Sequence, residues 1–81
     1  MVDVTLWGSL IALANDERQV EIDAKDIREL FRKLGERYPA MRDILENDVA
    51  VSVDGVIYRD NWSKDLPRDA EVFLMRRLSG G

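Results

Sequence analysis

Residues 23–39 read DAKDIRELFRKLGERYP, and this stretch decides the fold. Its apolar side chains recur at the spacing of one helix face, while charged residues take most of the remaining positions. The apolar positions are Ile27, Leu30, Phe31, Leu34 and Tyr38. We expect Asp23 to cap the N-terminus of this helix, because a carboxylate accepts hydrogen bonds from free backbone N–H groups, and Pro39 to end the helix. An apolar stripe of this length is typical of a helix that lies across a sheet.

Alternating apolar and polar residues predict strands on both sides of this helix. The predicted strands are residues 2–7, 19–23, 49–54, 56–58 and 71–75. The first two are separated by the short apolar stretch 10–13 and should pair as a hairpin, and Asp54-Gly55 is a strong signal for a tight turn. One further helical turn is predicted at Met41, Ile44 and Leu45. Because helix and strands are segregated, we expect an α+β fold with one main helix packed across one face of a mixed sheet.

The last predicted strand carries apolar side chains on both of its faces. Val72 and Leu74 occupy one face, and Phe73 and Met75 occupy the other. If the helix covers the first pair, then Phe73 and Met75 lie on the uncovered face of the sheet. Trp7 joins them there if the first and last strands are neighbours.

The composition predicts one small domain without metal or thiol chemistry. The chain has 81 residues, a net charge of −4, and neither cysteine nor histidine. Without these residue types there are no disulfides, thiolate nucleophiles or usual zinc ligands, so no metal site is expected. The acidic balance argues against nucleic-acid binding. No apolar run approaches the ~20 residues of a membrane span, and no signal peptide is recognised, so we expect a cytoplasmic protein with no membrane partner.

The sequence finishes with LSGG at residues 78–81, preceded by Arg76 and Arg77. Glycine has no Cβ, so it can enter a channel that is too narrow for any other residue. Two final glycines therefore suit a carboxylate that is threaded into the active site of another protein. The same four residues also suit an ordinary flexible tail, and taken alone they favour that simpler interpretation.

Five segments along the chain together match the pattern of a known family. They are residues 2–7, 34–39, 51–55, 66–72 and the closing glycines 80–81. In this order, and over nearly the whole length, the chain resembles the MoaD/ThiS family of sulfur carriers, which are ubiquitin-like (β-grasp) proteins. The resemblance is closest to the small subunit of molybdopterin synthase. Two departures are the turn at 68–71 and the basic approach to the glycines at 75–79, which is closer in character to the tail of ubiquitin.

The resemblance implies a single β-grasp domain over residues 1–81 with a flexible C-terminal tail at 76–81. It implies that a partner enzyme of the MoeB/ThiF type uses ATP to adenylate the Gly81 carboxylate, and that a persulfide donor then converts it to a thiocarboxylate. The chain binds no cofactor and is no enzyme by itself in this scheme. It donates sulfur beside the molybdopterin synthase large subunit in molybdenum cofactor biosynthesis. The residues expected to contact partners are Trp7, Phe73, Met75, Arg76, Arg77, Leu78, Ser79 and Gly80.

Other uses of the same terminus stay open at this point. The resemblance also fits a sulfur carrier for thiazole (thiamine) synthesis or for tRNA thiolation. The basic approach to Gly81 fits a ubiquitin-like protein modifier that ends as an amide on a lysine of its target. A plain interaction module, in which the glycines have no role, is the third possibility.

Overall fold

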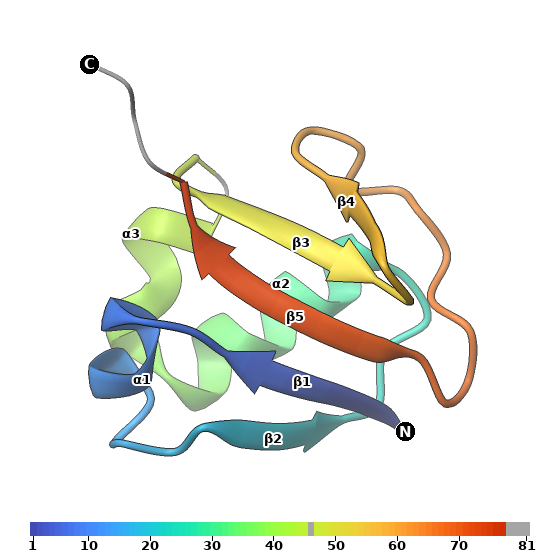
Figure 1. Ribbon diagram of the computed structural model, residues 1–81. Coiled ribbons are helices and arrows are strands. Elements are labelled where there is room, and N and C mark those ends of the chain that lie inside the picture. The colour runs from blue at the N-terminus through green and yellow to red at the C-terminus, as the bar shows by residue number, and fades with distance from the viewer. Residues whose placement is uncertain (46, 78–81) are drawn as a thin grey trace.

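The computed structural model describes residues 1–45 and 47–77, which form five strands and four helical segments (Figure 1). In chain order these are β1 (Val2–Leu6), α1 (Ser9–Leu13), β2 (Gln19–Ile22), α2 (Ile27–Arg37), η1 (Pro39–Met41), α3 (Arg42–Leu45), β3 (Val49–Val53), β4 (Val56–Tyr58) and β5 (Glu71–Arg76). The strands form one sheet in the order β2-β1-β5-β3-β4. β1 and β5 are parallel, and the other neighbours are antiparallel. The predicted α+β arrangement, with one main helix across one face of a mixed sheet, is confirmed.

The core lies between α2 and one face of the sheet. Every second residue of β1 and β5 is buried, and these side chains cluster with the apolar face of α2. On the helix the buried residues are Ile27, Leu30, Phe31, Leu34 and Gly35. Fully burying one large aliphatic side chain contributes about 1.5–3 kcal/mol. The alternation therefore determines which face of the sheet the helix covers, and it directs the remaining side chains to the opposite face.

Some element boundaries differ from the sequence prediction. The apolar stretch 10–13, for which no helix is predicted, lies in α1, and its Leu10 is fully buried. Five residues are too few to display a helical period, so the sequence gives no signal for α1. β2 ends one residue early, at Ile22, and β5 continues to Arg76. α2 has only 11 residues, and nowhere in residues 1–45 or 47–77 is a helix long and apolar enough to cross a membrane.

The predicted tight turn at Asp54-Gly55 joins β3 to β4. Both residues have positive φ, 48° and 91°, as two-residue hairpin loops require. Asp54 Oδ1 also accepts the backbone N–H of Glu71 at 2.9 Å, which ties the turn to the start of β5. The turn thereby sets the antiparallel register of β4 against β3.

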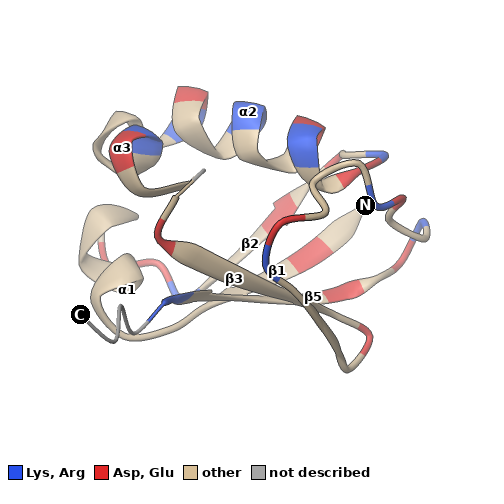
Figure 2. Ribbon diagram, turned by 90° about the horizontal axis from the view of Figure 1, so that it is seen from above, with Lys and Arg blue, Asp and Glu red and all other residues tan. Residues whose placement is uncertain are grey.

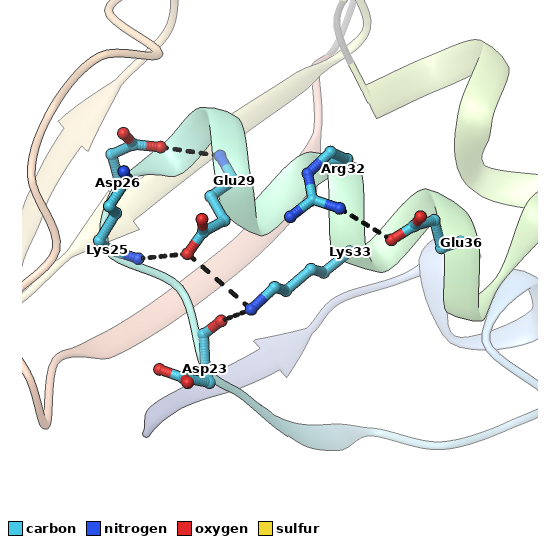
Figure 3. Close-up of polar contacts among 7 residues, drawn as sticks. All are labelled: Asp23, Lys25, Asp26, Glu29, Arg32, Lys33 and Glu36. Carbon is cyan, nitrogen blue, oxygen red and sulfur yellow. Dashed lines mark hydrogen bonds and ion pairs between the residues drawn. The ribbon is translucent and has the colours of Figure 1, made fainter.

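The N-terminus of α2 is capped by Asp26 and not by Asp23, so the predicted N-cap is wrong (Figure 3). Asp26 Oδ1 accepts the backbone N–H of Glu29 at 2.8 Å. Glu29 Oε1 in turn accepts the backbone N–H of Lys25 at 3.0 Å and lies 3.9 Å from Lys33 Nζ. Asp23 contributes its backbone oxygen, which accepts from Lys33. Asp26 has extended backbone angles (φ −150°, ψ 173°), so the helix begins only at the following residue.

Replacing the capping side chain should weaken the fold. Asp26→Ala leaves a backbone N–H of the first turn without its acceptor, so we expect the free energy of unfolding to fall by about 1 kcal/mol. Asp23→Ala is the matched control and should cost less than about 0.5 kcal/mol, because the variant keeps the backbone oxygen that contacts Lys33. Urea unfolding followed by circular dichroism measures both values. Equal losses in the two variants would contradict the assignment of the cap.

Tyr38 closes the C-terminal end of α2 and has a shifted pKa. Its side chain is buried, and its hydroxyl donates to Glu17 Oε1 at 3.2 Å. Burial raises the pKa of Tyr38 above its ordinary value of 10.0, the positive charge of Arg37 lowers it in part, and the hydrogen bond to Glu17 raises it again. Because the folded state favours the neutral phenol, its contribution to stability is complete below the ordinary pKa. That contribution is lost as the pH rises through the raised pKa.

Tyr38→Phe should therefore change the alkaline stability of the protein. Near neutral pH the variant should be less stable by about 0.5–1.5 kcal/mol, because it lacks the hydrogen bond to Glu17. Above about pH 10 the wild type loses stability by ionising and the variant does not, so the difference should shrink or reverse. Urea unfolding near neutral pH and above about pH 10 tests this, with Tyr58→Phe as the matched control, because it removes a hydroxyl from a half-buried tyrosine and keeps the hydrogen bond between Tyr38 and Glu17. A difference that stays constant across the alkaline range would refute the role given to Tyr38.

Candidate functional site

The face of the sheet that α2 leaves uncovered carries the candidate site. Figure 2, viewed from above, shows α2 and α3 on one side of the sheet. On the other side one row crosses β1, β5, β3 and β4 through Thr5, Phe73, Ser52 and Ile57. Met75 and Ala50 are partners in the neighbouring row. We call Trp7, Ala50, Ile57, Phe73 and Met75 the open-face patch.

Three residues predicted for this face, Trp7, Phe73 and Met75, are brought together because β1 and β5 are neighbours. The backbone N–H of Trp7 donates to Leu74 O at 3.1 Å, which continues the parallel ladder past the end of β1. The rings of Trp7 and Phe73 meet edge to face, with centroids 6.2 Å apart and an interplanar angle of 70°. Trp7 is 56% exposed, and Phe73 and Met75 are half-buried. The arrangement thus offers apolar surface that a protein partner can cover.

Two members of the open-face patch, Ile57 and Ala50, were not predicted from the sequence. Ile57 is 56% exposed and lies opposite Ser52 in the β3–β4 hairpin. Ala50 lies opposite Met75. The position of Ile57 opposite Ser52 could have been predicted from the sequence, because the turn at Asp54-Gly55 determines the register of the hairpin. The place of Ala50 depends on the pairing of β3 with β5, which no local pattern specifies.

A groove of about 530 Å³ leads from the open-face patch to the end of β5. Its lining residues are Asn47, Asp48, Ala50, Ile57, Arg59, Met75, Arg76 and Arg77. Three of these belong to the patch, and three others are arginines. The groove therefore combines an apolar wall with positive charge close to the last described residue.

Arg77 joins three parts of the fold at the end of β5. Its backbone N–H donates to Asp48 O at 2.5 Å. Its Nη2 donates to Asp60 Oδ1 at 3.0 Å and also to the backbone oxygen of Arg59. Its Nε is buried and has no hydrogen-bond partner within the described residues. The Arg77 side chain, for which the sequence suggests a partner contact, is thus engaged by its own fold.

The predicted tail at 76–81 differs from the structure at its first two positions. Arg76 is the last residue of β5, and Arg77 is held by the contacts just given. The other predicted site residues, Leu78, Ser79, Gly80 and Gly81, lie outside the described residues. The described site therefore consists of the open-face patch and the groove that ends at Arg77, and it does not include the predicted reactive residue Gly81.

Removing the Arg77 side chain should loosen the base of the C-terminal segment. In Arg77→Ala the hydrogen bonds to Arg59 and Asp60 are lost, so the backbone amide of residue 77 should become more mobile. Nitrogen-15 relaxation should report a lower order parameter at that amide, with little change in global stability, because Asp60 is exposed. Arg76→Ala removes the same charge one residue earlier, where the β-ladder holds the backbone, and is the matched control. Equal changes in both variants would count against an anchoring role for Arg77.

Comparisons with known proteins agree with the fold. The chain superposes on the solution structure of small archaeal modifier protein 1 from Methanosarcina acetivorans with a TM-score of 0.84 and 19% identity, covering 99% of this chain and 95% of that one. The Amycolatopsis orientalis BexX/CysO complex gives a TM-score of 0.83 and 16% identity, with all of both chains covered. The complex of subunits 1 and 2 of the Helicobacter pylori molybdopterin-converting factor gives a TM-score of 0.68 and 22% identity, covering 99% of this chain and 97% of that one. These neighbours confirm the ubiquitin-like β-grasp fold.

The family is decided by the sequence comparison. No curated protein sequence matches the chain significantly. The family model described as the ThiS family matches residues 4–81, from within β1 through β5 to the closing glycines. The predicted MoaD/ThiS resemblance is therefore confirmed, and this small ubiquitin-like chain belongs to the ThiS family.

Proposed function

We propose that this chain is a sulfur carrier whose Gly81 carboxylate is converted to a thiocarboxylate by partner enzymes. The observation that carries the proposal is the ThiS-family match, which extends through the two terminal glycines. A partner of the MoeB/ThiF type transfers AMP from ATP to the carboxylate and releases pyrophosphate. The outer sulfur of a persulfide donor then attacks the adenylate and displaces AMP, which leaves an acyl disulfide. A thiol of the donor or of another partner cleaves the S–S bond of that acyl disulfide, so that the thiocarboxylate is released and the donor ends in a disulfide. Because the first step consumes ATP, the proposal places the carrier in the cytoplasm.

The chemistry of the terminus explains why a partner enzyme is needed. An α-carboxyl group has a pKa near about 3.3–3.7, so it is ionised at neutral pH, and a carboxylate anion is a poor electrophile. Adenylation removes that charge from the carbonyl and supplies AMP as a leaving group. The chain has no cysteine, so it has no thiol on which to carry sulfur by another route. The chain itself acts as substrate and carrier, and the catalytic groups belong to its partners.

The open-face patch supplies the binding energy that a threaded terminus lacks. Holding each residue of an extended segment in place costs about 1–2 kcal/mol, so a short terminal segment alone binds weakly. Burying an aromatic side chain removes about 150–250 Å² from water at about 25 cal/mol per Å², which offsets much of that cost. Trp7 and Phe73 lie side by side on the patch, and the arginine-lined groove extends from it toward Arg77. We infer that partners cover this patch while they act on Gly81.

We propose that the carrier donates its sulfur in molybdopterin biosynthesis, with this chain acting as the small subunit beside a molybdopterin synthase large subunit. The support is the likeness to subunit 1 of molybdopterin-converting factor from two organisms, Helicobacter pylori and Pyrococcus furiosus, each at 22% identity. A carrier for thiazole synthesis or tRNA thiolation is the alternative within the same chemistry.

A second candidate function is a protein modifier that is joined through Gly81 to lysines of target proteins. The likeness to small archaeal modifier protein 1, together with the basic residues Arg76 and Arg77, favours it. It requires covalent conjugates in cell extracts that reducing agents do not cleave. Without such conjugates the carrier function stands alone.

Intact-protein mass spectrometry tests the carrier function directly. Incubation with ATP, an adenylating enzyme of the MoeB/ThiF type and a persulfide donor should raise the mass by about 16 Da, as replacement of one oxygen by sulfur requires. Deletion of Gly81 should abolish the change. No mass shift, in a mixture that modifies another carrier, would rule the proposal out for that enzyme class.

The same reaction distinguishes the contribution of the terminus from that of the open-face patch. The double variant Trp7→Ala and Phe73→Ala keeps Gly81 but lacks the aromatic pair, so its reaction should slow at low enzyme concentration and recover at high concentration. Arg18→Glu, at an exposed position before β2, is the control and should react like the wild type.

A further inference from the structure

A second groove lies on the helix side of the molecule, away from the open-face patch. It has a volume of about 560 Å³ and lies between α2, α3 and the loop that carries Trp62. Its floor and wall contain Phe31, Leu45 and Trp62, and its rim carries Arg28, Arg32 and Arg42. Figure 2 shows basic positions along α2 and α3 on this side of the sheet. The proposed chemistry at Gly81 uses none of these residues.

The apolar wall of this groove is built by the packing of Trp62 on α2. The rings of Trp62 and Phe31 meet edge to face with centroids 4.8 Å apart. The backbone N–H of Arg28 donates to Trp62 O at 2.8 Å, which fastens the loop to the first turn of the helix. Phe31 is buried, whereas Trp62 is only partly buried and keeps apolar surface toward the groove. The groove thus has a fixed aromatic wall.

One arginine of the rim, Arg42, is positioned by Gly35, and glycine inside a helix costs about 1 kcal/mol relative to alanine. Arg42 lies across this glycine, and its Nε donates to Gly35 O at 3.0 Å. A Cβ on residue 35 would lie 3.2 Å from Arg42 Cγ, closer than most such contacts. The missing side chain therefore gives Arg42 room to reach the groove.

The charge of this groove is opposite to that of the whole molecule. The chain carries −4, yet the lining of the groove contains three arginines and one acidic residue, Glu36. Glu36 pairs with Arg32 at 3.1 Å, and both side chains are more than half exposed, so water screens the pair and leaves both available to a ligand. An anionic group entering the groove meets a net positive rim beside an apolar wall.

We propose that this groove docks an acidic peptide segment of a protein partner, with an apolar side chain seated against Trp62 and carboxylates facing the arginines. Guanidinium groups bind carboxylates through paired hydrogen bonds, which suits the rim. A long polyanion such as nucleic acid would meet the acidic remainder of the surface, whereas a short segment contacts only the groove. Because the groove and the open-face patch lie on opposite sides of the sheet, the acidic segment can bind in the groove while another partner covers the patch. The proposal does not depend on what Gly81 does.

The test uses the full chain labelled with nitrogen-15 and a synthetic acidic peptide, acetyl-DEDLFDED-amide. Its neutral counterpart, acetyl-NQNLFNQN-amide, keeps the apolar pair and lacks the carboxylates. The acidic peptide should shift the backbone amides of Arg28 and Arg32 and the indole N–H of Trp62, while amides of the open-face patch stay in place. Affinity should fall several-fold from low to physiological salt, because part of the attraction is between exposed charges. The neutral peptide should bind at least about tenfold more weakly.

Two charge-reversed variants make the test specific to the groove. Arg28→Glu should weaken binding of the acidic peptide by about fivefold or more. Folding should be retained, because a negative side chain suits the first turn of a helix. Arg18→Glu carries the same charge change outside the groove and should alter affinity by less than about twofold. Circular dichroism of both variants checks the fold.

Several outcomes would overturn the proposal. These are no amide shifts up to millimolar peptide, equal binding of the neutral peptide, equal effects of the two variants, or shifts confined to the open-face patch. Binding of single-stranded DNA or of anionic vesicles at the same residues, without binding of the acidic peptide, would assign the groove to another class of ligand and would also overturn it.

Discussion

The parallel pairing of β1 with β5 is the contact on which the rest of the structure depends. It brings the first and last strands side by side in the sheet, with Val4 opposite Val72 and Leu6 opposite Leu74 beneath α2. The same register places Thr5 opposite Phe73 on the other face. A slip of one residue would turn the buried set of either strand to water, so the core selects this register strongly. The register that the core selects therefore also determines which side chains form the candidate site on the opposite face.

The two sides of the sheet leave different chemistry exposed. The open side has an apolar patch centred on Trp7 and Phe73, from which an arginine-lined groove extends to Arg77. The helix side has an aromatic wall at Trp62 beneath a rim of arginines. Because the sheet separates these surfaces, a partner that covers one of them leaves the other accessible. The hydrogen bonds of Arg77 to residues before β3 and after β4 keep the end of β5 at a constant position relative to the open-face patch.

Much of the candidate site follows from sequence alone, because alternation along one strand assigns Phe73 and Met75 to the face opposite Val72 and Leu74. The family follows in the same way from short segments in a given order. The role of Arg77 does not follow, since its partners Arg59 and Asp60 come from another loop. The role proposed for Gly81 follows from the family match, which extends through the closing glycines.

By itself, the sequence determined the main helix, the strands, the turn at Asp54-Gly55 and the family. These are encoded in the spacing of nearby residues, where helical and strand periods and turn preferences act directly. Only the tertiary structure decided that Asp26 and not Asp23 caps α2, that residues 9–13 form a helix, and that Trp62 packs on Phe31. The contact of Trp62 with Phe31 and the burial of Leu10 in the helix at 9–13 depend on packing between segments far apart in the chain. Asp26 is the cap because its extended backbone delays the start of the helix. Local propensities of about 1 kcal/mol or less are too small to decide such contacts.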